Sequence, residues 1–332
     1  MNIERIPILE SQAIQEFITK YSDCAFNSPD WCRVLQDGFN SEVLCYCLKD
    51  SEKLKLVLPG ILLDFKIIKI FYSNIPYGGF IGEQEYVLDF LPLLEKVLKK
   101  EGVHMFRLTK KINDNYHNFL GYKLQRGCQQ IINIDGLSEQ GLWLGYRKRV
   151  RRDIRRAEKL GVQVKEISDR KDIEILYQLY QETMKRNNSF TVWTKKAFYS
   201  IYDNLVLKGE GNILFADVNN KHIAGIILIY SSDTLFYFMN ASSTDYLTFC
   251  PNDLLLHRTI ISGIKTNKKY VDLMTSRESD VELIKFKEKW GSRNFPFFIL
   301  EKDLSFIRVK IWNILWAMVN SKLITPLIRV FH

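Results

Sequence analysis

The sequence predicts a mixed α/β fold, an α+β arrangement in which twisted mixed sheets are flanked by helices, and three observations support this. The chain has 332 residues, which is room for two domains of ordinary size, each with its own core. Hydrophobic residues make up 46% and charged residues 26%, which is typical of a globular protein. Segments with strand patterns alternate with segments of helical periodicity, which indicates sheets covered by helices.

The first half contains two predicted helices and four predicted strands. Apolar periodicity predicts helices at Pro29–Phe39 and Val87–Lys100, and strands at 43–48, 54–63, 67–74 and 104–108. The third strand ends at a turn with the sequence Pro-Tyr-Gly-Gly, residues 76–79.

The second half repeats this alternation on a larger scale. We expect helices at 171–186, 194–208 and 251–265, and strands at 212–218, 222–231, 234–241, 270–274 and 295–300. Asn219 and Asn220 lie between the first two strands and predict a hairpin turn. The two halves therefore follow a similar order of elements, although their sequences have little in common.

A strongly basic helix is predicted between the halves, at residues 138–160. Ser138 can cap its first turn and Gly161 can end it. Trp143, Val150, Ile154 and Ala157 form its apolar stripe, and Arg147, Arg151 and Arg155 follow one flank. Eight of the thirteen residues from Arg147 to Lys159 are basic, and like charges four residues apart repel. This favours a phosphate-bearing ligand, and the alternative is a solvated face whose partners are Asp153 and Glu158.

The whole chain is basic, with a formal net charge of +9. Such a charge favours polyanionic partners: nucleotide phosphates, tRNA, lipid-linked pyrophosphates or an anionic membrane face. General solubility is the competing explanation.

The six cysteines show no Cys-x-x-Cys pair and no spacing to histidine that suits zinc, so no metal site is predicted. We expect reduced thiols in a cytoplasmic protein. The N-terminal stretch MNIERIPILESQ lacks the apolar core of a signal peptide, and no apolar run is long enough to span a bilayer.

The end of the second half carries the most informative motif, YVDLMTSRESDVELIKFKEKWGSRNFPFFIL at residues 270–300. Together with PNDLLLHRTIISGI at 251–264, YRKRVRRDIRRAEKLGV at 146–162 and SNIPYGGF at 73–80, it resembles the FemAB/FemX-like acyltransferases. These form a branch of the GNAT superfamily that includes CelD/BioF-type acetyltransferase domains of polysaccharide gene clusters. The element with Phe286, Lys287 and, after three further residues, Gly291 is its most specific part.

The resemblance implies tandem GNAT-like domains. It divides the chain into an N-terminal GNAT-like domain (1–137), the basic connecting helix (138–161), a C-terminal acyltransferase domain (162–303) and an amphipathic tail (304–332). It also implies transfer of an acyl or aminoacyl group from acyl-CoA or aminoacyl-tRNA, with no permanently bound cofactor. The acceptor would be an amine of a cell-envelope saccharide or of its lipid- or nucleotide-linked precursor.

The family's donor site lies where two parallel strands separate and leave backbone groups free to hold the acyl group. Here the resemblance assigns this role to residues 234–241 and 270–274. Acyl transfer to an amine needs a positioned carbonyl, a donor for the developing oxyanion and a proton acceptor. No Ser-His-Asp signature is visible in the chain.

Lys287 is the central catalytic candidate, since the family associates the lysine of this element with a phosphate of substrate or donor. An exposed lysine between Lys285 and Lys289 is the alternative. Asp272 is expected to orient the amine or Arg277, or to cap the loop. Tyr237, Glu282 and Asp280 are candidates for proton transfer.

The expected donor-binding residues lie at two further places. Pro251 and Asn252 open a helix whose free N–H groups suit a phosphate, although Asp253 in the same turn opposes an anion and an ordinary helix start is the alternative. The sequence lacks the glycine-rich loop of acetyl-CoA-dependent GNAT enzymes here, which leaves the donor open. Ser276 and Arg277 correspond to a turn of the polysaccharide-associated branch, and Arg147, Arg151 and Arg155 are added from the basic helix.

The acceptor side is expected to include Arg186, Asn188, Tyr77, Gly78 and Gly79. A structural role is the stronger interpretation for each: Arg and Asn are common at the C-terminal ends of helices, and Gly78-Gly79 suits a tight turn.

The tail after residue 303 holds Trp312, Trp316 and several aliphatic residues, with Arg308, Lys310, Lys322 and Arg329 between them. We expect part of it to pack on the first domain. Contact with a membrane surface is a second hypothesis for the tail. The acyltransferase interpretation further expects Lys287 and the basic helix to converge on one phosphorylated ligand in a shared crevice. Its rival is a catalytically silent GNAT relative that binds tRNA or a membrane surface.

Overall fold

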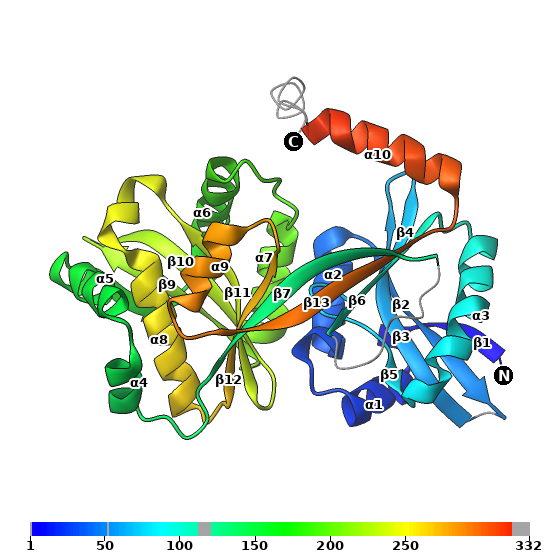
Figure 1. Cartoon of the computed structure of the whole chain (residues 1–332), viewed down its shortest axis with the longest axis horizontal. Coiled ribbons are helices and arrows are strands. Elements are labelled where there is room, and N and C mark those ends of the chain that lie inside the picture. The colour runs from blue at the N-terminus through cyan, green and yellow to red at the C-terminus, as the bar shows by residue number, and fades with distance from the viewer. Residues whose placement is uncertain (1, 52, 112–120, 321–332) are drawn as a thin grey trace. The chain divides into compact units, whose positions relative to one another are not determined.

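The computed structural model describes residues 2–51, 53–111 and 121–320 and contains two compact units (Figure 1). Unit 1 is made of Met1–Ser22, Ser41–Gln125 and Phe298–His332, and unit 2 of Asp23–Asn40 and Arg126–Phe297. These bounds differ from the predicted ones: residues 23–40 and the basic segment 138–161 belong to unit 2, and residues 298–303 return to unit 1.

Unit 1 is a sheet in the order β1-β2-β3-β4-β6-β13 with three helices. Its elements are β1 (Asn2–Pro7), α1 (Gln12–Tyr21), β2 (Glu42–Asp50), β3 (Lys53–Asp64), β4 (Lys69–Ser73), β5 (Ile81–Gly82), α3 (Val87–Lys100), β6 (Met105–Lys111), the end of β13 (Arg293–Asp303) and α10 (Phe306–Asn320). Short 3-10 turns lie at Ile8–Glu10 and Gln84–Tyr86. Leucine and phenylalanine side chains of α3 cover β2, β3 and β6 and form the core.

Unit 2 is a second mixed sheet, in the order β7-β12-β11-β10-β9-β8. Its elements are α2 (Pro29–Phe39), β7 (Lys123–Asn133, from Arg126), α4 (Glu139–Gly145), α5 (Lys148–Lys159), β8 (Gln163–Glu166), α6 (Asp172–Arg186), α7 (Lys195–Ile201), η4 (Tyr202–Val206), β9 (Gly211–Val218), β10 (Lys221–Tyr230), β11 (Thr234–Ser242), α8 (Pro251–Lys265), β12 (Tyr270–Arg277), α9 (Val281–Glu288) and the start of β13. 3-10 turns lie at Ala25–Asn27 and Thr244–Phe249.

The two units repeat one arrangement of elements. In unit 1 the antiparallel meander β2-β3-β4 is followed by α3 and by β6, which pairs with β4 in parallel. In unit 2 the meander β9-β10-β11 is followed by α8 and by β12, which pairs with β11 in parallel. The predicted mixed fold and its tandem repeat are therefore confirmed.

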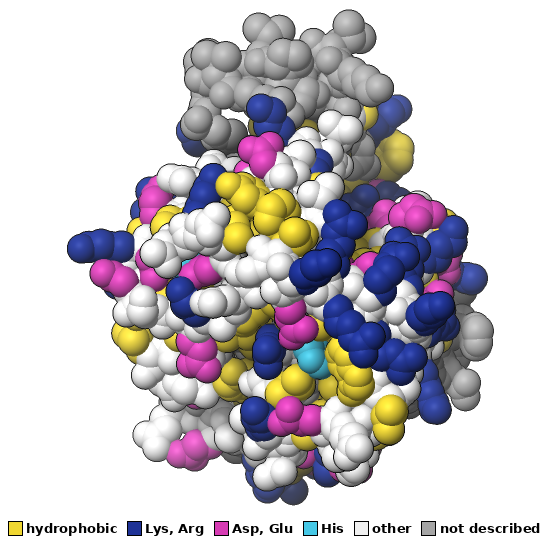
Figure 2. Space-filling model, turned by 90° about the vertical axis from the view of Figure 1, so that its left-hand side faces the viewer, with side chains coloured by type: hydrophobic (Ala, Val, Ile, Leu, Met, Phe, Trp, Pro, Cys, Tyr) yellow, Lys and Arg dark blue, Asp and Glu magenta, His cyan; other side chains and the backbone are white. Residues whose placement is uncertain are grey.

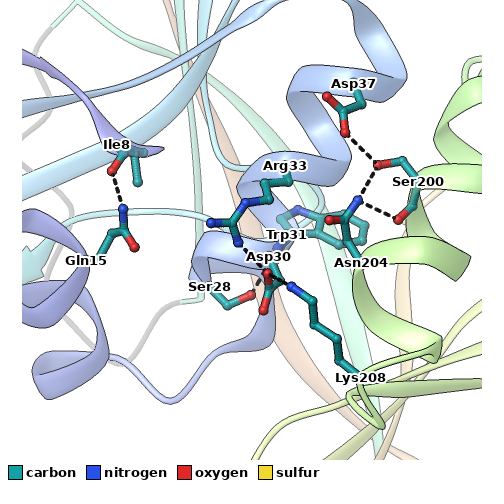
Figure 3. Close-up of polar contacts among 10 residues, drawn as sticks. All are labelled: Ile8, Gln15, Ser28, Asp30, Trp31, Arg33, Asp37, Ser200, Asn204 and Lys208. Carbon is teal, nitrogen blue, oxygen red and sulfur yellow. Dashed lines mark hydrogen bonds and ion pairs between the residues drawn. The ribbon is translucent and has the colours of Figure 1, made fainter. Parts of the chain in front are cut away.

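Residues 23–40 join unit 2 because α2 packs against α7 and η4. In Figure 3, Asp30 pairs with Lys208 at 2.5 Å, and the Ser200 hydroxyl donates to Asp37 at 3.4 Å. The rings of Trp31 and Trp193 lie 5.7 Å apart. Sequence periodicity places α2 at its observed bounds but carries no information about this distant partner.

The predicted basic helix is two helices, α4 and α5, and the prediction of one continuous helix is wrong. Tyr146 and Arg147 lie between the two helices and have an extended backbone conformation. The break follows Gly145, a poor helix former, and lets Tyr146 bury its ring. The Tyr146 hydroxyl lies 3.1 Å from His257 Nδ1, and its ring meets Trp290 edge-on at 5.3 Å. Val150, Ile154 and Ala157 are fully buried against α8, as the predicted stripe requires.

Three other differences concern element ends. The helix predicted at 194–208 is α-helical to Ile201 and continues as a π-helical turn, η4. β12 extends to Arg277 and β13 to Asp303.

No helix within the described part of the chain has the length and apolar character that crossing a bilayer requires.

Candidate active site

Unit 2 contains the separated strand pair that the family resemblance implies. β11 and β12 pair in parallel at three positions, Thr234 with Tyr270, Leu235 with Val271 and Phe236 with Asp272. Beyond this point β11 stays paired with β10 up to Ser242, and β12 stays paired with β7 up to Arg277. Among the described residues no β11–β12 pair follows Asp272, so the facing backbone edges of the two strands are available to a ligand.

A bulge in β12 accompanies the split. The pairing of β12 with β7 shifts register between Asp272 and Thr275, and Met274 adopts a left-handed backbone with φ 63°. The Asp272 carboxylate is fully buried, accepts the Met274 N–H at 2.8 Å and contacts the Gln129 amide. Because a left-handed methionine is strained, its neighbours must hold this bend in place.

Lys287 on α9 holds the other side of the bulge. Its ammonium donates to the carbonyl oxygens of Met274 at 3.1 Å and Thr275 at 3.3 Å, and to Ser276 Oγ at 2.8 Å. The Lys287 side chain is buried, and burial lowers its pKa to about 8 despite the opposing charge of Asp272. The alternative of an exposed lysine is wrong.

Ser276 links this cluster to β7, since its buried hydroxyl donates to Gln130 Oε1 at 2.7 Å. Arg277, in contrast, is exposed at the end of β12, where its N–H donates to Asp280 at 3.3 Å. Of the predicted pair, Ser276 therefore belongs to the bulge and Arg277 faces solvent.

The start of α8 lies beside β11 and carries a buried charge network. Pro251 is the first helical residue, and Asp253 accepts from Lys289 Nζ at 2.5 Å. Lys289 also lies 3.9 Å from Asp153 of α5. Burial raises the pKa of Asp253, and Lys289 opposes this rise. This carboxylate makes the start of α8 a poor seat for a phosphate, as the sequence indicates.

Tyr237 and Asn252 bring unused polar groups to the same region. The Tyr237 hydroxyl is buried and makes no hydrogen bond of normal geometry to any described residue. Burial and the nearby Asp253 carboxylate raise the pKa of Tyr237. The Asn252 amide donates to Ser242 Oγ at 3.2 Å, while its buried Oδ1 lacks a partner in the described chain. Buried unpaired polar atoms of this kind suit a ligand.

Arg186 stabilises the end of β11. Its guanidinium donates to the Ser242 carbonyl at 2.9 Å and to Thr244 Oγ1 at 3.0 Å. Asn188 follows α6 in the left-handed conformation, with φ 50°, which is common at helix ends. Arg186 thus has structural contacts to the residues at the end of β11, and a role of Arg186 or Asn188 in binding the acceptor stays a prediction.

The remaining predicted residues lie elsewhere. Glu282 is 89% exposed and pairs with Lys285 at 3.0 Å, so its carboxylate faces solvent. Tyr77, Gly78 and Gly79 belong to unit 1, where Tyr77 is buried and a side chain on Gly78 would meet Asn74 O at 2.6 Å. These glycines serve a tightly packed turn, the stronger interpretation from the sequence.

An open hollow of about 1060 Å³ lies on α4 and α5. It is lined by Trp143, Leu144, Lys148, Arg149, Arg151, Arg152 and Arg155. Figure 2 shows Lys and Arg side chains gathered on this face of the molecule. Arg147 does not line it and instead precedes the first turn of α5.

The charges around the hollow are poorly balanced. Asp153 lies 3.0 Å from Arg152 and 3.8 Å from Arg149, so among the described residues it forms ion pairs with two of the five lining cations. Arg155 stacks over Trp143, and Arg151 donates to the Leu144 carbonyl at 3.2 Å. Glu158 lies near Arg258 of α8 instead, so one of the two neutralising partners proposed for a solvated face is used elsewhere.

The hollow on α4 and α5 is not a crevice shared with Lys287. Lys287 does not line the hollow, and its three donors are directed at the backbone and side chain of β12. The structure thus does not bring Lys287 to the cations of the hollow, and their convergence on one phosphate stays a prediction.

Sequence reasoning does not assign a role to Lys289, Gln129, Gln130 or the Tyr146–His257 pair. Lys289 follows Lys287 by two residues in a basic run, and nothing local distinguishes the two. Among the described residues no group of three or more His, Cys, Asp or Glu side chains is placed to hold a metal ion.

A comparison with protein families identifies the class of this site. Residues 145–288 match the sequence profile described as the GNAT acetyltransferase domain. The matched segment contains α5, the split between β11 and β12, and Lys287. The GNAT-type acetyltransferase match thus covers the segment of unit 2 that holds the split, and not the whole chain. A search of curated protein sequences finds no match.

Solved structures share the fold of the whole chain. FemX is 15% identical with a TM-score of 0.66, over 90% of this chain and 97% of that one. A tandem GNAT protein from the clavulanic acid biosynthesis pathway is 8% identical with a TM-score of 0.60, over 92% and 99%. L-PGS from Bacillus licheniformis is 14% identical with a TM-score of 0.58, over 91% and 93%. The predicted FemAB-like GNAT fold is thereby confirmed.

Proposed function

We propose that this protein is an N-acyltransferase that moves an acyl or aminoacyl group from acyl-CoA or aminoacyl-tRNA to an amine of a cell-envelope saccharide or its precursor. The observation that carries the proposal is the split between β11 and β12 in a GNAT-type domain. Free backbone N–H groups at such an edge can hold an acyl carbonyl and stabilise the oxyanion that forms when an amine attacks it.

The side chains around the split can position the backbone, donate a proton or accept a hydrogen bond. Asp272 and Lys287 hold the bulge of β12, so they act as positioning residues for the backbone edge. The Tyr237 hydroxyl can donate to the departing group of the donor, since its raised pKa keeps it protonated. Asn252 Oδ1 is a free acceptor at the start of α8.

The hollow on α4 and α5 supports a phosphate-bearing donor. Five cations with one paired carboxylate attract polyanions, and Arg side chains suit phosphate geometry. The Asp253 carboxylate at the start of α8 disfavours the alternative seat for a phosphate there. A donor with an extended phosphate backbone, aminoacyl-tRNA, fits this distribution better than a single pyrophosphate.

Mass spectrometry of acceptor mixtures tests the proposal. The purified protein is incubated with acetyl-CoA or charged tRNA and with amino-sugar precursors, and products heavier by one acyl or aminoacyl group are expected. Tyr237→Phe should lower the yield while leaving the fold intact, and Leu207→Ala, an exposed change far from β11 in sequence, is the control. Absence of product with every donor and acceptor would contradict transfer.

A catalytically silent relative that binds tRNA is the second candidate, and the basic hollow favours it. Binding to tRNA without product in the same mixtures would support it. Salt titration measures that binding directly, because each phosphate contact steepens the dependence of affinity on salt.

A further inference from the structure

α10 and the turn between β3 and β4 form an unusual exposed apolar surface in unit 1. We call it the α10 surface; its members are Phe65, Ile67, Phe306, Ile307, Ile311, Ile314, Leu315 and Trp316. Each is at least 37% exposed, and Phe306 and Ile307 are more than 70% exposed. A helix that is apolar on most sides is normally covered, and apolar patches of this kind mark interaction sites.

The helix is fixed to unit 1 by one narrow side. Val309 is buried with Ile68, Ile70 and Met105, and Trp312 packs on the same cluster. The Trp312 ring stacks on Phe65 at 5.0 Å, and Arg308 donates to the Ile67 carbonyl at 3.3 Å. Figure 1 shows α10 lying across the tip of the hairpin of β3 and β4. The apolar side chains are therefore presented on a positioned element.

The charges that accompany this surface are mostly basic, and Asp64, which accepts the Lys66 N–H at 2.9 Å, is an exposed acid beside Phe65. From Leu304 to His332 the sequence contains Arg308, Lys310, Lys322 and Arg329 but no Asp or Glu. Lys66 lies in the turn between Phe65 and Ile67, within the same surface. An apolar surface with basic residues and tryptophan is complementary to the headgroup region of an anionic bilayer.

We propose that the α10 surface binds the anionic face of a phospholipid membrane, with α10 lying in the plane of the headgroups. Other occupants fit the charges less well. A second copy of this chain would bring a second surface of the same mostly basic charge, and residues 321–332 offer two more bases and no acid. Like charges placed together in an apolar contact destabilise it.

This inference goes beyond acyl transfer and does not require it. If the acceptor is a lipid-linked saccharide, membrane binding would raise the enzyme's local concentration beside its substrate. If the protein proves to be catalytically silent, the lipid surface remains a property of unit 1 that can be measured by itself.

Vesicle flotation with the full-length protein tests the proposal. We expect binding to vesicles of phosphatidylcholine mixed with phosphatidylglycerol, weakened by salt, and much weaker binding to phosphatidylcholine alone. The double variant Ile311→Asp, Ile314→Asp should lower partitioning at least about tenfold, because it removes two apolar contacts and adds two negative charges. Lys310→Gln should lower it about fivefold through charge alone.

Matched controls separate membrane contact from folding. Leu207→Asp replaces an apolar residue of unit 2 that is more exposed than Ile311 and Ile314, and it should leave vesicle binding unchanged. Point variants are preferable to deletion after Asp303, since deletion removes Val309 and Trp312 from the core of unit 1. Thermal unfolding of each variant should match the wild type, because the changed side chains are exposed.

Four results would overturn the proposal. The first is absence of binding to both kinds of vesicle, and the second is wild-type binding by the double aspartate variant. The third is a dimer in light scattering that the double variant dissociates while vesicles are not bound, which would identify a second copy as the occupant. The fourth is equal, salt-insensitive binding to both kinds of vesicle, which would exclude recognition of an anionic headgroup.

Discussion

Lys287→Met is the substitution that best separates a positioning lysine from a ligand-binding one. Methionine keeps most of the buried hydrocarbon and removes the ammonium. The carbonyls of Met274 and Thr275 and the Ser276 hydroxyl then lose a donor. At about 1 kcal/mol for each lost partner, this loss costs about 3 kcal/mol.

An opposing effect of similar size comes from the charge itself. The pKa of Lys287 falls from 10.5 to about 8 on burial, so keeping the lysine protonated at neutral pH costs the folded state about 3 kcal/mol. Methionine avoids this cost. We therefore expect the free energy of unfolding of the variant at pH 7 to lie within about 2 kcal/mol of the wild type.

The local consequence should be larger than the global one. Without the Lys287 ammonium, the strained bulge at Met274 loses one of its two supports, and amide hydrogen exchange of residues 273–276 should rise by at least about tenfold. The transfer activity of the variant should fall, because the backbone of β12 is then held less firmly. Lys285→Met is the matched control, because that side chain is exposed and two residues away. Unchanged exchange at residues 273–276 in the Lys287→Met variant would refute the positioning role.

Four further measurements test other parts of the structure. The wild type should gain stability relative to Lys287→Met as pH rises from about 8 to 10.5, because the unfolded lysine stays protonated while the folded one loses its proton; denaturant titrations at both ends measure this. His257, whose pKa burial lowers to about 4, should contribute stability above pH 6.5 that is lost as the pH falls through 4, by about 3 kcal/mol, and His257→Gln should remove this dependence in acid titrations. Tyr237→Phe should leave stability unchanged or raise it by up to about 1 kcal/mol in thermal unfolding, since the buried hydroxyl makes no hydrogen bond of normal geometry. Arg149→Gln with Arg152→Gln should reduce the salt dependence of tRNA binding by about two phosphate contacts, whereas Lys171→Gln, an exposed change outside the hollow, should not.

The sequence predicts elements well where periodicity is strong and local signals end the element. α2 and α3 have their predicted bounds because Ser28 and Pro29 start the first and an apolar stripe runs through the second. β7 is not predicted, because its first half is polar and exposed and its pattern does not alternate. Sequence order alone assigns residues 23–40 to the first domain, since only tertiary contacts such as those of Trp31 with Trp193 and Phe238 reveal that they belong to unit 2.

The candidate site is predictable in its strands but not in its side-chain contacts. The order of a meander, a helix and a returning strand is enough, together with the family resemblance, to place the split at 234–241 and 270–274. The direction of Lys287 depends on the bulge at Met274, a bend that a non-glycine residue adopts only under tertiary constraint. A basic run such as 285–289 does not indicate which lysine is buried, so Lys287 and Lys289 are separable only in three dimensions.

Each unit contains a parallel strand pair at which an acyl donor could bind, β4–β6 in unit 1 and β11–β12 in unit 2. The two pairs differ just beyond the point where the pairing ends. In unit 1 the β4–β6 pairing ends at Tyr72 and Arg107, and buried side chains bridge the strands just beyond. Thr109 N–H donates to Ser73 Oγ at 2.9 Å, and the Thr109 hydroxyl donates to the Asn74 carbonyl at 3.2 Å.

These contacts use the backbone edge that a ligand would need in unit 1. In unit 2, by contrast, the polar side chains beside the split hold β12 from the side of α9 and β7. Side-chain contacts of Ser73 and Thr109 therefore occupy the strand edges just beyond the parallel pairing in unit 1. In unit 2, Asp272 and Lys287 hold the bulge of β12 instead. The chain should accordingly bind one acyl donor, in the unit whose strand edges remain free, and the duplicated unit 1 is left to support other contacts, including the lipid surface formed by α10.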